Sequence, residues 1–480
     1  MSRKDALEQL FHPKSIAVVG ASSNPVGHGH NFMKYVTSYG FQGNIYPINP
    51  RQDEVTGLKA YPDLEHVPST IDHVIVAVSL NNVPNLIEQG ARKGVKTMHV
   101  YAGRASETGR PEAKKLDAEI LRLARERNIT LIGPNALGIF CPASGLAFGY
   151  DFPKEPGNVG AMMQSGANST DLIHISALRG VKFSKVVSYG NALDINESDL
   201  LEYFTDDNET KVLLCYIEGL RIDREHYFKL IQKAAGKKPV IVCKGGRSQA
   251  GARWSLHHTA SPAGSVNDWE KQIRQAGAIP VKNLDEMANM AVAFSLLPPV
   301  KGKRVGIGGG GGGTCVLAAD QWEENGFEVP PLPQEIREEF KRRGSQLWDW
   351  VDNPADWSIL AAGDPYTIDA ALLEMSKHPD FDFIAACVGE DHPFWKDHFI
   401  QELTANVEGY IKVSKAGHKP LLAICPERSL GIAEMDSWRY RTFAGIRTRL
   451  IEERIPFFPT VNQAAQAVTE LISYYQRKKD

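Results

Sequence analysis

The residues best suited to covalent chemistry in this chain are two adjacent histidines, His257 and His258, in a segment rich in small residues. The segment runs from Lys244 to Gly264 and follows an apolar run that is typical of a strand. A neutral imidazole whose second nitrogen is held by a hydrogen bond is a competent phosphoryl acceptor. The glycines predict an extended, mobile loop, on which a histidine could carry phosphate between two sites. A solvated histidine without a function is the alternative.

Two other segments supply what a phosphohistidine needs. Glu218 follows the apolar run 212–217, and a carboxylate at the carboxyl edge of a parallel strand could fix the tautomer of an imidazole. Gln164, Ser165 and Gly166 form a strand-to-helix junction, where small residues can expose the N–H groups of a helix start to an anion. A solvated strand-end carboxylate is the alternative for Glu218.

A glycine-rich turn follows the first apolar run, Ile16 to Val19, and precedes a predicted helix. Such a turn lets backbone N–H groups approach a phosphate, although tight turns without a ligand are about as common. The turn is not the G-x-G-x-x-G fingerprint, and the second run ends in Asn49 rather than in an acidic residue. Both features disfavour a nicotinamide dehydrogenase, because the ribose contact of NAD is missing.

Short apolar runs alternate with amphipathic stretches along the whole chain, which predicts repeated βα units and parallel sheets covered on both faces. Breaks in this rhythm occur at the segment 151–157 and at 298–302. We therefore expect an α/β protein of three doubly wound, Rossmann-like or flavodoxin-like domains. Their predicted bounds are residues 1–150, 151–298 and 299–480, each with a parallel sheet.

Composition excludes several classes of function. The formal net charge of -3 gives no basic field for nucleic acid or an anionic membrane surface. No apolar stretch approaches the length of a membrane span, so we expect a cytoplasmic protein with no membrane partner. No pair of cysteines has metal-ligand spacing, and no metal site is predicted. An anionic ligand would therefore be held locally.

The chain resembles the ADP-forming (NDP-forming) acyl-CoA synthetases, which include the acetate–CoA ligases and the α subunit of succinyl-CoA synthetase. The resemblance rests on the order and spacing of short motifs along nearly the whole chain rather than on one motif. These motifs are Gly20-Ala-Ser-Ser-Asn-Pro25, Gly133-Pro-Asn-Ala-Leu-Gly138, Gln164-Ser-Gly166, Ser188-Tyr-Gly-Asn191, Glu197-Ser-Asp-Leu-Leu201, Tyr216-Ile-Glu-Gly219, His258-Thr259 and Asn353-Pro-Ala-Asp356.

The resemblance implies an N-terminal CoA-binding domain followed by two flavodoxin-like ligase domains. It places the phosphorylated histidine at His258, because that residue directly precedes Thr259, and the supporting carboxylate at Glu218. Phosphate binding falls on Gln164, Ser165 and Gly166. The residues that it implies for CoA are Gly20, Ala21, Ser22, Asn24, Pro25, Asn49 and Asn135.

By this resemblance the chain is the α-type subunit of an acid–CoA ligase that converts a small carboxylic acid, CoA and ATP to acyl-CoA, ADP and phosphate. The reaction would pass through an acyl phosphate and a phosphohistidine. No part of the sequence reads as an ATP-grasp domain, so we expect ATP/ADP and Mg²⁺ to be bound by a β-type partner subunit in a hetero-oligomer.

Two departures from the family pattern support a rival function. Pro262 stands in the histidine segment, and Ala-Asn-Ser-Thr follows Gly166 where Ala-Leu-Gly is usual. A proline restricts a backbone that should swing. The rival is a CoA-binding regulatory or scaffold subunit whose histidine is no longer active.

Overall fold

The computed structural model describes residues 2–259, 266–389, 395–426 and 437–478. It contains three main sheets, and the predicted α/β class with parallel sheets is confirmed. Each sheet has one strand order when its parallel strands are numbered along the chain, namely 2-1-3-4-5. This is the flavodoxin-like order, in which the first strand lies between the second and the third. The crevice at the carboxyl end of that first strand is where such sheets bind ligands.

The first sheet has its strands in the order β2 (Asn44–Ile48), β1 (Ser15–Val19), β5 (His73–Val76), β6 (Thr97–Val100) and β7 (Thr130–Ile132). Apolar side chains of α3 (Val83–Arg92) and α4 (Pro111–Glu126) form one core with these strands. The other helices of this region are α1 (Arg3–Phe11) and α2 (His28–Ser38), and a hairpin pairs β3 (Glu54–Val55) with β4 (Leu58–Lys59). Every residue of β1, β5, β6 and β7 is buried, as expected for a parallel sheet covered on both faces.

The second sheet follows the order β13 (Ile279–Val281), β12 (Val240–Lys244), β11 (Val212–Ile217), β9 (Val159–Met163), β10 (Phe183–Ser188) and β8 (Gly138–Phe140). Only β8 is antiparallel among these strands, and the sequence did not predict it. The helices that follow the parallel strands of this sheet along the chain are α5 (Gly166–Ala177), α6 (Glu197–Asp206), α7 (Arg224–Lys237), α8 (Gln249–Thr259), α9 (Val266–Gln275) and α10 (Leu284–Leu296).

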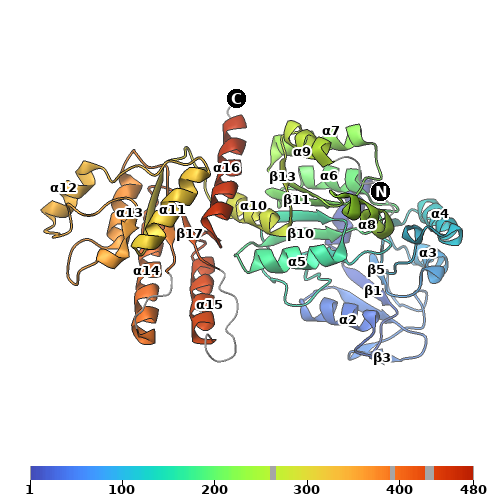
Figure 1. Cartoon of the computed structure of the whole chain (residues 1–480). Helices are drawn as coiled ribbons and strands as arrows, with labels where there is room; N and C mark the ends of the chain where they lie inside the picture. Colours follow the sequence, from blue (N-terminus) through green and yellow to red (C-terminus); the bar gives the residue numbers. More distant parts are fainter. Residues whose placement is uncertain (1, 260–265, 390–394, 427–436, 479–480) are drawn as a thin grey trace. The chain divides into compact units, whose positions relative to one another are not determined.

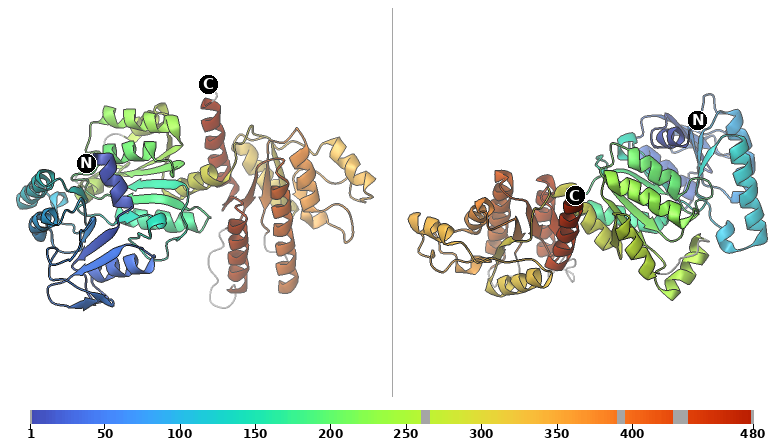
Figure 2. Two further views of the ribbon diagram at one scale, coloured as in Figure 1. Left: turned by 180° about the vertical axis from the view of Figure 1, so that it is seen from behind. Right: turned by 90° about the horizontal axis from the view of Figure 1, so that it is seen from above.

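The third sheet follows the order β15 (Ala355–Asp356), β14 (Val305–Gly310), β16 (Phe383–Cys387), β17 (Leu421–Ile424) and β18 (Phe457–Phe458). Helices α14 (Lys396–Ala416) and α15 (Ser437–Glu452) lie side by side, as Figure 1 and both views of Figure 2 show. The remaining helices are α11 (Gly312–Glu324), α12 (Gln334–Arg342), α13 (Ile368–Lys377) and α16 (Val461–Arg477).

The chain divides into two compact units by its internal contacts. Residues 1–177 and 182–287 form the first unit, which contains the first two sheets. Residues 178–181 and 288–480 form the second unit, which contains the third sheet. The predicted domain bounds at 150 and 298 stay predictions. Among the described residues, no helix has both the length and the apolar character needed to span a bilayer.

Candidate functional site

The carboxyl ends of β9 and β11 bring Gln164 and Glu218 together in the second sheet. β9 pairs with β10 on one side and with β11 on the other, so this edge is the point at which the strand order reverses. Side chains that directly follow β9 and β11 therefore meet in the crevice that the topology creates. The sequence placed both residues at strand ends, and the structure brings them into contact.

Gln164 ties the two strand ends to each other. Its side-chain Oε1 accepts hydrogen bonds from the backbone N–H of Glu218 at 2.6 Å and of Gly219 at 3.1 Å. Because two N–H donors face this atom, it must be the amide oxygen rather than the nitrogen. The residue is only 1% exposed. The sequence predicted that Gln164 binds phosphate. In the structure its Oε1 is hydrogen-bonded to the backbone of Glu218 and Gly219 and so positions these residues.

Ser165 and Gly166 lead from β9 into α5. The hydroxyl of Ser165 accepts a hydrogen bond from the backbone N–H of Asn168 at 3.4 Å, and its carbonyl accepts one from Ser169. A side-chain Cβ at Gly166 would lie 2.8 Å from Leu137, so this position admits only a glycine without local movement. The positive end of the α5 dipole thus begins directly at the reversal point.

Glu218 is 6% exposed and is surrounded by hydrogen-bond donors. Its Oε1 accepts from the Tyr216 hydroxyl at 3.2 Å. Its backbone carbonyl accepts from Nζ of Lys244 at 2.7 Å and from the hydroxyl of Ser255 at 3.1 Å. The solvated strand-end carboxylate is therefore not what the structure contains: Glu218 is a buried, hydrogen-bonded group.

Two ionisable groups beside Glu218 have shifted pKa values. Burial, followed by the charge of Glu218, raises the pKa of the Tyr216 hydroxyl above its ordinary range. Burial lowers the pKa of Lys244 to about 8, and the negative charge of Glu218 opposes that shift. Lys244 is 4% exposed, and its ammonium also lies 5.3 Å from the centre of the Trp269 ring. Tyr216 therefore stays a hydrogen-bond donor and Lys244 a cation at neutral pH.

The segment that carries the histidines is partly helical, which corrects the prediction of an extended loop. Helix α8 spans Gln249–Thr259. The Ser248 hydroxyl accepts a hydrogen bond from the backbone N–H of Gly251 at 3.0 Å, and such a side-chain cap favours the start of a helix despite the nearby glycines. His257 and His258 belong to the last turn of α8, and their side chains lie outside the described part of the structure. Pro262 lies outside the described residues.

Helix α8 is anchored at Glu218 by the hydrogen bond from Ser255. Ser255 precedes His258 by three residues in the same helix, and the rise of an α-helix over that interval is about 4.5 Å. The predicted phosphohistidine therefore belongs to a helix that is tied to the backbone carbonyl of Glu218, the residue predicted to support it.

The glycine-rich turn after β1 is held by its own side chains. Gly20 has φ +86, and a Cβ there would lie 2.7 Å from Val78. The hydroxyl of Ser22 accepts from the backbone N–H of Asn24 at 3.0 Å, and Oδ1 of Asn24 accepts from that of Val26 at 3.3 Å. Both side-chain acceptors therefore stabilise the turn. Pro25, the last of the predicted CoA residues in this turn, lies between these two hydrogen-bonded amides.

Asn49 also serves this turn. It follows β2, and its Nδ2 donates to the carbonyl of Ala21 at 2.7 Å while its Oδ1 accepts from the backbone of Arg51 at 2.8 Å. Because those two hydrogen bonds orient the side chain, Asn49 couples the carboxyl end of β2 to the turn after β1. The residue was predicted as a neighbour of CoA, and in the structure its side chain supports the turn through the hydrogen bond to Ala21.

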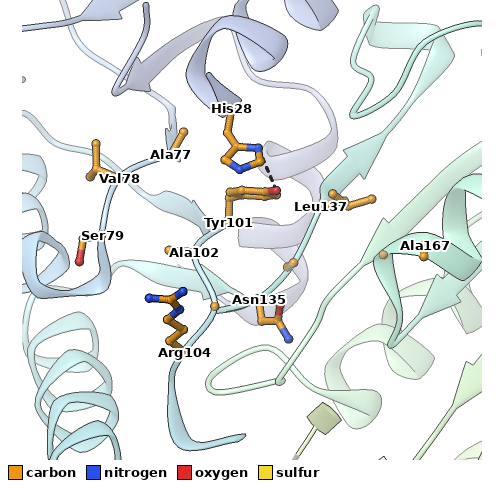
Figure 3. A pocket seen from close by; sticks show the side chains of 13 residues that line it. His28, Ala77, Val78, Ser79, Tyr101, Ala102, Arg104, Asn135, Leu137 and Ala167 are labelled. Atoms are coloured by element: carbon orange, nitrogen blue, oxygen red, sulfur yellow. Dashed lines mark hydrogen bonds between the residues drawn. The ribbon is translucent and has the colours of Figure 1, made fainter. Parts of the chain in front are cut away.

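A pocket of about 610 Å³ lies between the carboxyl ends of the first sheet and the start of α5. Asn135 and Gly166 are the predicted site residues that line it, whereas the turn from Gly20 to Pro25 and Asn49 do not. The other lining residues are mostly small or apolar: His28, Ala77, Val78, Ser79, Tyr101, Ala102, Gly103, Arg104, Ala136, Leu137 and Ala167. Figure 3 shows the pocket from close by.

The sequence did not identify His28, Tyr101 and Arg104 as site residues. Tyr101 and His28 are joined by a hydrogen bond of 3.1 Å between the hydroxyl and Nδ1, and their ring centres are 4.7 Å apart (Figure 3). Tyr101 directly follows β6, and His28 begins α2. The signals available in the sequence were that Tyr101 follows an interior strand and that His28 follows the glycine-rich turn, since ligand sites form at such strand ends.

A second pocket, of about 540 Å³, opens beside Glu218. Its lining includes Tyr216, Lys244 and Gly245, together with Asn168 of α5. Ala167, the preceding residue, lines the first pocket. The first turn of α5 therefore borders both pockets, one at the first sheet and one at the predicted phosphoryl-transfer residues.

Two parts of the chain match known family models. Residues 14–142 match the model described as a CoA binding domain, and residues 156–294 match the model described as a succinyl-CoA ligase like flavodoxin domain. The first range contains the first sheet, and the second range contains the five parallel strands of the second sheet, while β8 falls in the first range.

The chain is similar to proteins of the same kind over most of its length. It is 33% identical over 420 residues to the α subunit of the ADP-forming acetate–CoA ligase II of Pyrococcus furiosus, covering 87% of this chain and 89% of that protein. It is 37% identical over 337 residues to the ADP-forming acetate–CoA ligase of Methanocaldococcus jannaschii, covering 70% of this chain and 47% of that protein.

A solved structure shares the fold. The dinucleotide-forming acetyl-coenzyme A synthetase 1 of Ca. Korarchaeum cryptofilum, in complex with phosphate and ADP, matches with a TM-score of 0.77 and 28% identity. The match covers 98% of this chain and 97% of that chain. The similarity in structure thus extends beyond the two family models to the third sheet.

Proposed function

Because the chain belongs to the family of ADP-forming acyl-CoA synthetases, we propose that it forms acyl-CoA, ADP and phosphate from a small carboxylic acid, CoA and ATP. The direction of net flux depends on the concentrations of the reactants. We assign the chain the role of the α-type part, which binds CoA and carries phosphate on His258. The observation that carries this proposal is the hydrogen bond by which Ser255 anchors α8 at the buried Glu218.

The reaction has three covalent steps. A ring nitrogen of His258 attacks the γ-phosphorus of ATP, and the bond to the bridging oxygen breaks, releasing ADP. A carboxylate oxygen of the acid then attacks the phosphorus, which frees the imidazole and gives an acyl phosphate. Finally the thiolate of CoA, after loss of its proton to solvent, attacks the acyl carbon and displaces phosphate. Magnesium bound with the nucleotide neutralises charge during the first step.

The residues around Glu218 suit the first two steps. A buried carboxylate can accept a hydrogen bond from the imidazole nitrogen that is not phosphorylated, which orients the ring and stabilises its positive charge. The Tyr216 hydroxyl holds Oε1 of Glu218, and Lys244 holds its backbone carbonyl, so both residues fix the position of this carboxylate. The start of α5 supplies N–H groups and a positive dipole for the transferred phosphate.

ATP is bound, in this proposal, by an ATP-grasp module distinct from the three main sheets. The relatives include both a separate α subunit and the longer chain from Methanocaldococcus jannaschii, of which this chain covers 47%. We propose a separate β-type subunit and hence a hetero-oligomer. A fused module would serve the same chemistry.

The histidine assignment is tested by His258→Ala and its matched control His257→Ala, each with the ATP-grasp partner present. Labelled ATP should give acid-labile, base-stable protein phosphate in the wild type and in the His257 variant. We expect no phosphoenzyme and no acyl-CoA synthesis from the His258 variant, because alanine offers no nucleophile. Thermal melting checks that each variant is folded.

The rival is a CoA-binding regulatory or scaffold subunit, motivated by Pro262 and by the unusual residues after Gly166. One of those residues, Asn168, lines the pocket beside Glu218 together with Tyr216. A wild-type complex that binds CoA but never accumulates phosphohistidine would favour this rival. Phosphate that still accumulates on the His258 variant would place the nucleophile elsewhere.

A further inference from the structure

Arg104 brings a positive charge to a pocket that otherwise contains no charged group except a titratable histidine. Its side chain is exposed, and it lies on the side of the Tyr101 ring opposite His28 (Figure 3). No Asp or Glu lines this pocket in the part of the chain that the structure describes. Arg104 also forms no ion pair with a described carboxylate. A guanidinium in a pocket without a protein counter-ion favours an anionic ligand.

The backbone at Arg104 is held in a left-handed conformation with φ +68. Residues with a side chain rarely adopt this region unless their surroundings enforce it. Here Glu107 enforces it, because its Oε1 accepts from the backbone N–H of Arg104 at 2.6 Å and of Ala105 at 3.0 Å. The strain is thus maintained by a specific carboxylate clamp, and such maintained strain points to a function for the residue.

The clamp is connected to the second sheet. Asn191, which is buried in the loop between β10 and α6, donates from Nδ2 to Oε2 of Glu107 at 2.6 Å. The backbone carbonyl of Asn191 accepts from Nε of Arg221 at 2.9 Å, and its Oδ1 accepts from Nδ2 of Asn135 at 3.3 Å. Both oxygens of Glu107 are therefore used to fix the loop rather than to neutralise the guanidinium.

The clamped loop lies next to the histidine helix. Glu107 belongs to the 3-10 turn η2 (Ser106–Thr108), and η2 packs against α8. The first turn of α5 borders the same pocket through Gly166 and Ala167. Arg104 therefore projects into the pocket from a loop that touches the helix of the proposed phosphoryl carrier.

We propose that Arg104 is the oxyanion-binding side chain of this pocket, and that it holds a phosphate oxygen of a ligand there. The inference rests on the proposed function for the identity of the ligands, since a CoA phosphate and the phosphate transferred from the histidine share this chemistry. Arg104 acts by binding and orienting the anion, and no covalent bond to it is formed.

The test measures binding of CoA, pantetheine and inorganic phosphate to the full chain by calorimetry. The variants are Arg104→Gln, Arg104→Lys and Arg110→Gln, the last being a control because Arg110 is an exposed arginine outside the pocket. Loss of a charge-assisted hydrogen bond should weaken the affected ligand about 10- to 100-fold in Arg104→Gln. Arg104→Lys should recover part of that loss.

The pattern of losses identifies the source of the anion. A loss for CoA alone assigns Arg104 to a CoA phosphate, and a loss for inorganic phosphate alone assigns it to the transferred group. Equal losses for CoA and pantetheine, which has no phosphate, would overturn the inference because they would indicate altered packing. Affinities that match those of Arg110→Gln would overturn it as well.

Arg104→Gly separates binding from folding. Glycine adopts positive φ without strain, so this variant should melt at the same temperature as the wild type or higher while losing anion affinity. A lower melting temperature with unchanged affinity would show that Arg104 is only structural. A wild-type chain that binds none of the probes would refute the proposed CoA site together with this inference, whereas wild-type binding that Arg104→Gln leaves intact refutes the inference alone.

Discussion

The first and the second sheet each have a central strand, β1 or β9, at which the strand order reverses, yet the residues after their third strands differ. β5 is followed by Ala77 and Val78, and the polar groups nearby serve a glycine-rich turn. β11 is followed by Glu218, a buried carboxylate with a buried lysine beside it. Two sheets with one topology are thus equipped differently.

The two sheets share the features that come from their strand order and differ in the side chains placed at the reversal point. Both reversal points provide backbone N–H groups and the start of a helix, which suit any phosphate. The second also provides Glu218, a buried carboxylate that, in the proposed mechanism, would orient the imidazole of His258. We therefore expect substitutions in the second sheet to alter phosphoryl transfer and substitutions in the first sheet to alter CoA binding.

Among Glu218→Gln, Lys244→Met and Asn24→Asp, the first should have the largest effect. Glutamine can still accept the hydrogen bond from Tyr216, but it carries no charge to stabilise a positive imidazole. We expect phosphoenzyme formation to slow about 10- to 100-fold, as for other groups that orient a catalytic ligand. Rapid quench with labelled ATP measures the rate. Glu202→Gln, an exposed position on α6, is the control, and equal rates in both variants would remove Glu218 from the mechanism.

Lys244→Met should have a smaller effect, of about tenfold on phosphoenzyme formation, because it removes a charged hydrogen bond to the Glu218 carbonyl. Lys238→Met is a matched control. Lys238 is also buried and donates to two backbone carbonyls, of Phe204 and Asp207, and burial lowers its pKa to about 8 as well. It lines neither of the two pockets at the site.

Both lysines should also change how stability depends on pH. The pKa of each is about 8 in the folded chain and about 10.4 in the unfolded chain. Between these values the unfolded state binds more protons, so the free energy of unfolding contributed by each lysine rises with pH. Relative to either methionine variant, the wild type should gain stability from pH 8 to pH 10 in thermal melts. Only Lys244→Met should also slow phosphoenzyme formation. Equally slow phosphoenzyme formation in Lys238→Met would show that the loss of any buried lysine has this effect, rather than the loss of the one beside Glu218.

Most strands of the three main sheets were predictable because they are short, continuous apolar runs, whereas β13 and β15 at the sheet edges were not predicted. β9 and β11 begin and end where the runs Val159–Met163 and Val212–Ile217 do. β8 was missed because it has only three residues and is defined by its pairing with β10. Helix α8 was predicted as a loop because its glycines outweighed the cap from Ser248. Sequence patterns thus predict the strands that are continuous apolar runs, but not an element that depends on pairing with a distant strand or on a single capping side chain.

The site was predictable to the extent that it follows from topology. Gln164 and Glu218 could be placed because residues after the strands at a reversal point must meet. Arg104 could not, because its conformation depends on Glu107 and on Asn191, which are 84 residues apart in the chain. The roles of Gln164 and Asn49 as supports depend in the same way on hydrogen bonds between distant segments. Sequence reasoning finds residue types at strand ends, whereas tertiary hydrogen bonds decide which of them face a ligand.

Asn24→Asp should have the smallest effect and should act only on the first sheet. The carboxylate can accept the hydrogen bond from Val26 that Oδ1 of Asn24 now accepts, so the turn should keep its conformation. The added charge would repel the phosphates of CoA by about 1 kcal/mol at a partly solvated site, which corresponds to roughly fivefold weaker binding. Calorimetry with CoA measures this change, and Asn128→Asp at the exposed end of α4 is the control. High salt should reduce the difference, since exposed charges are screened. The phosphorylation rate of Asn24→Asp should equal that of the wild type. A variant with normal CoA affinity and slow phosphorylation would reverse the roles assigned to the two sheets.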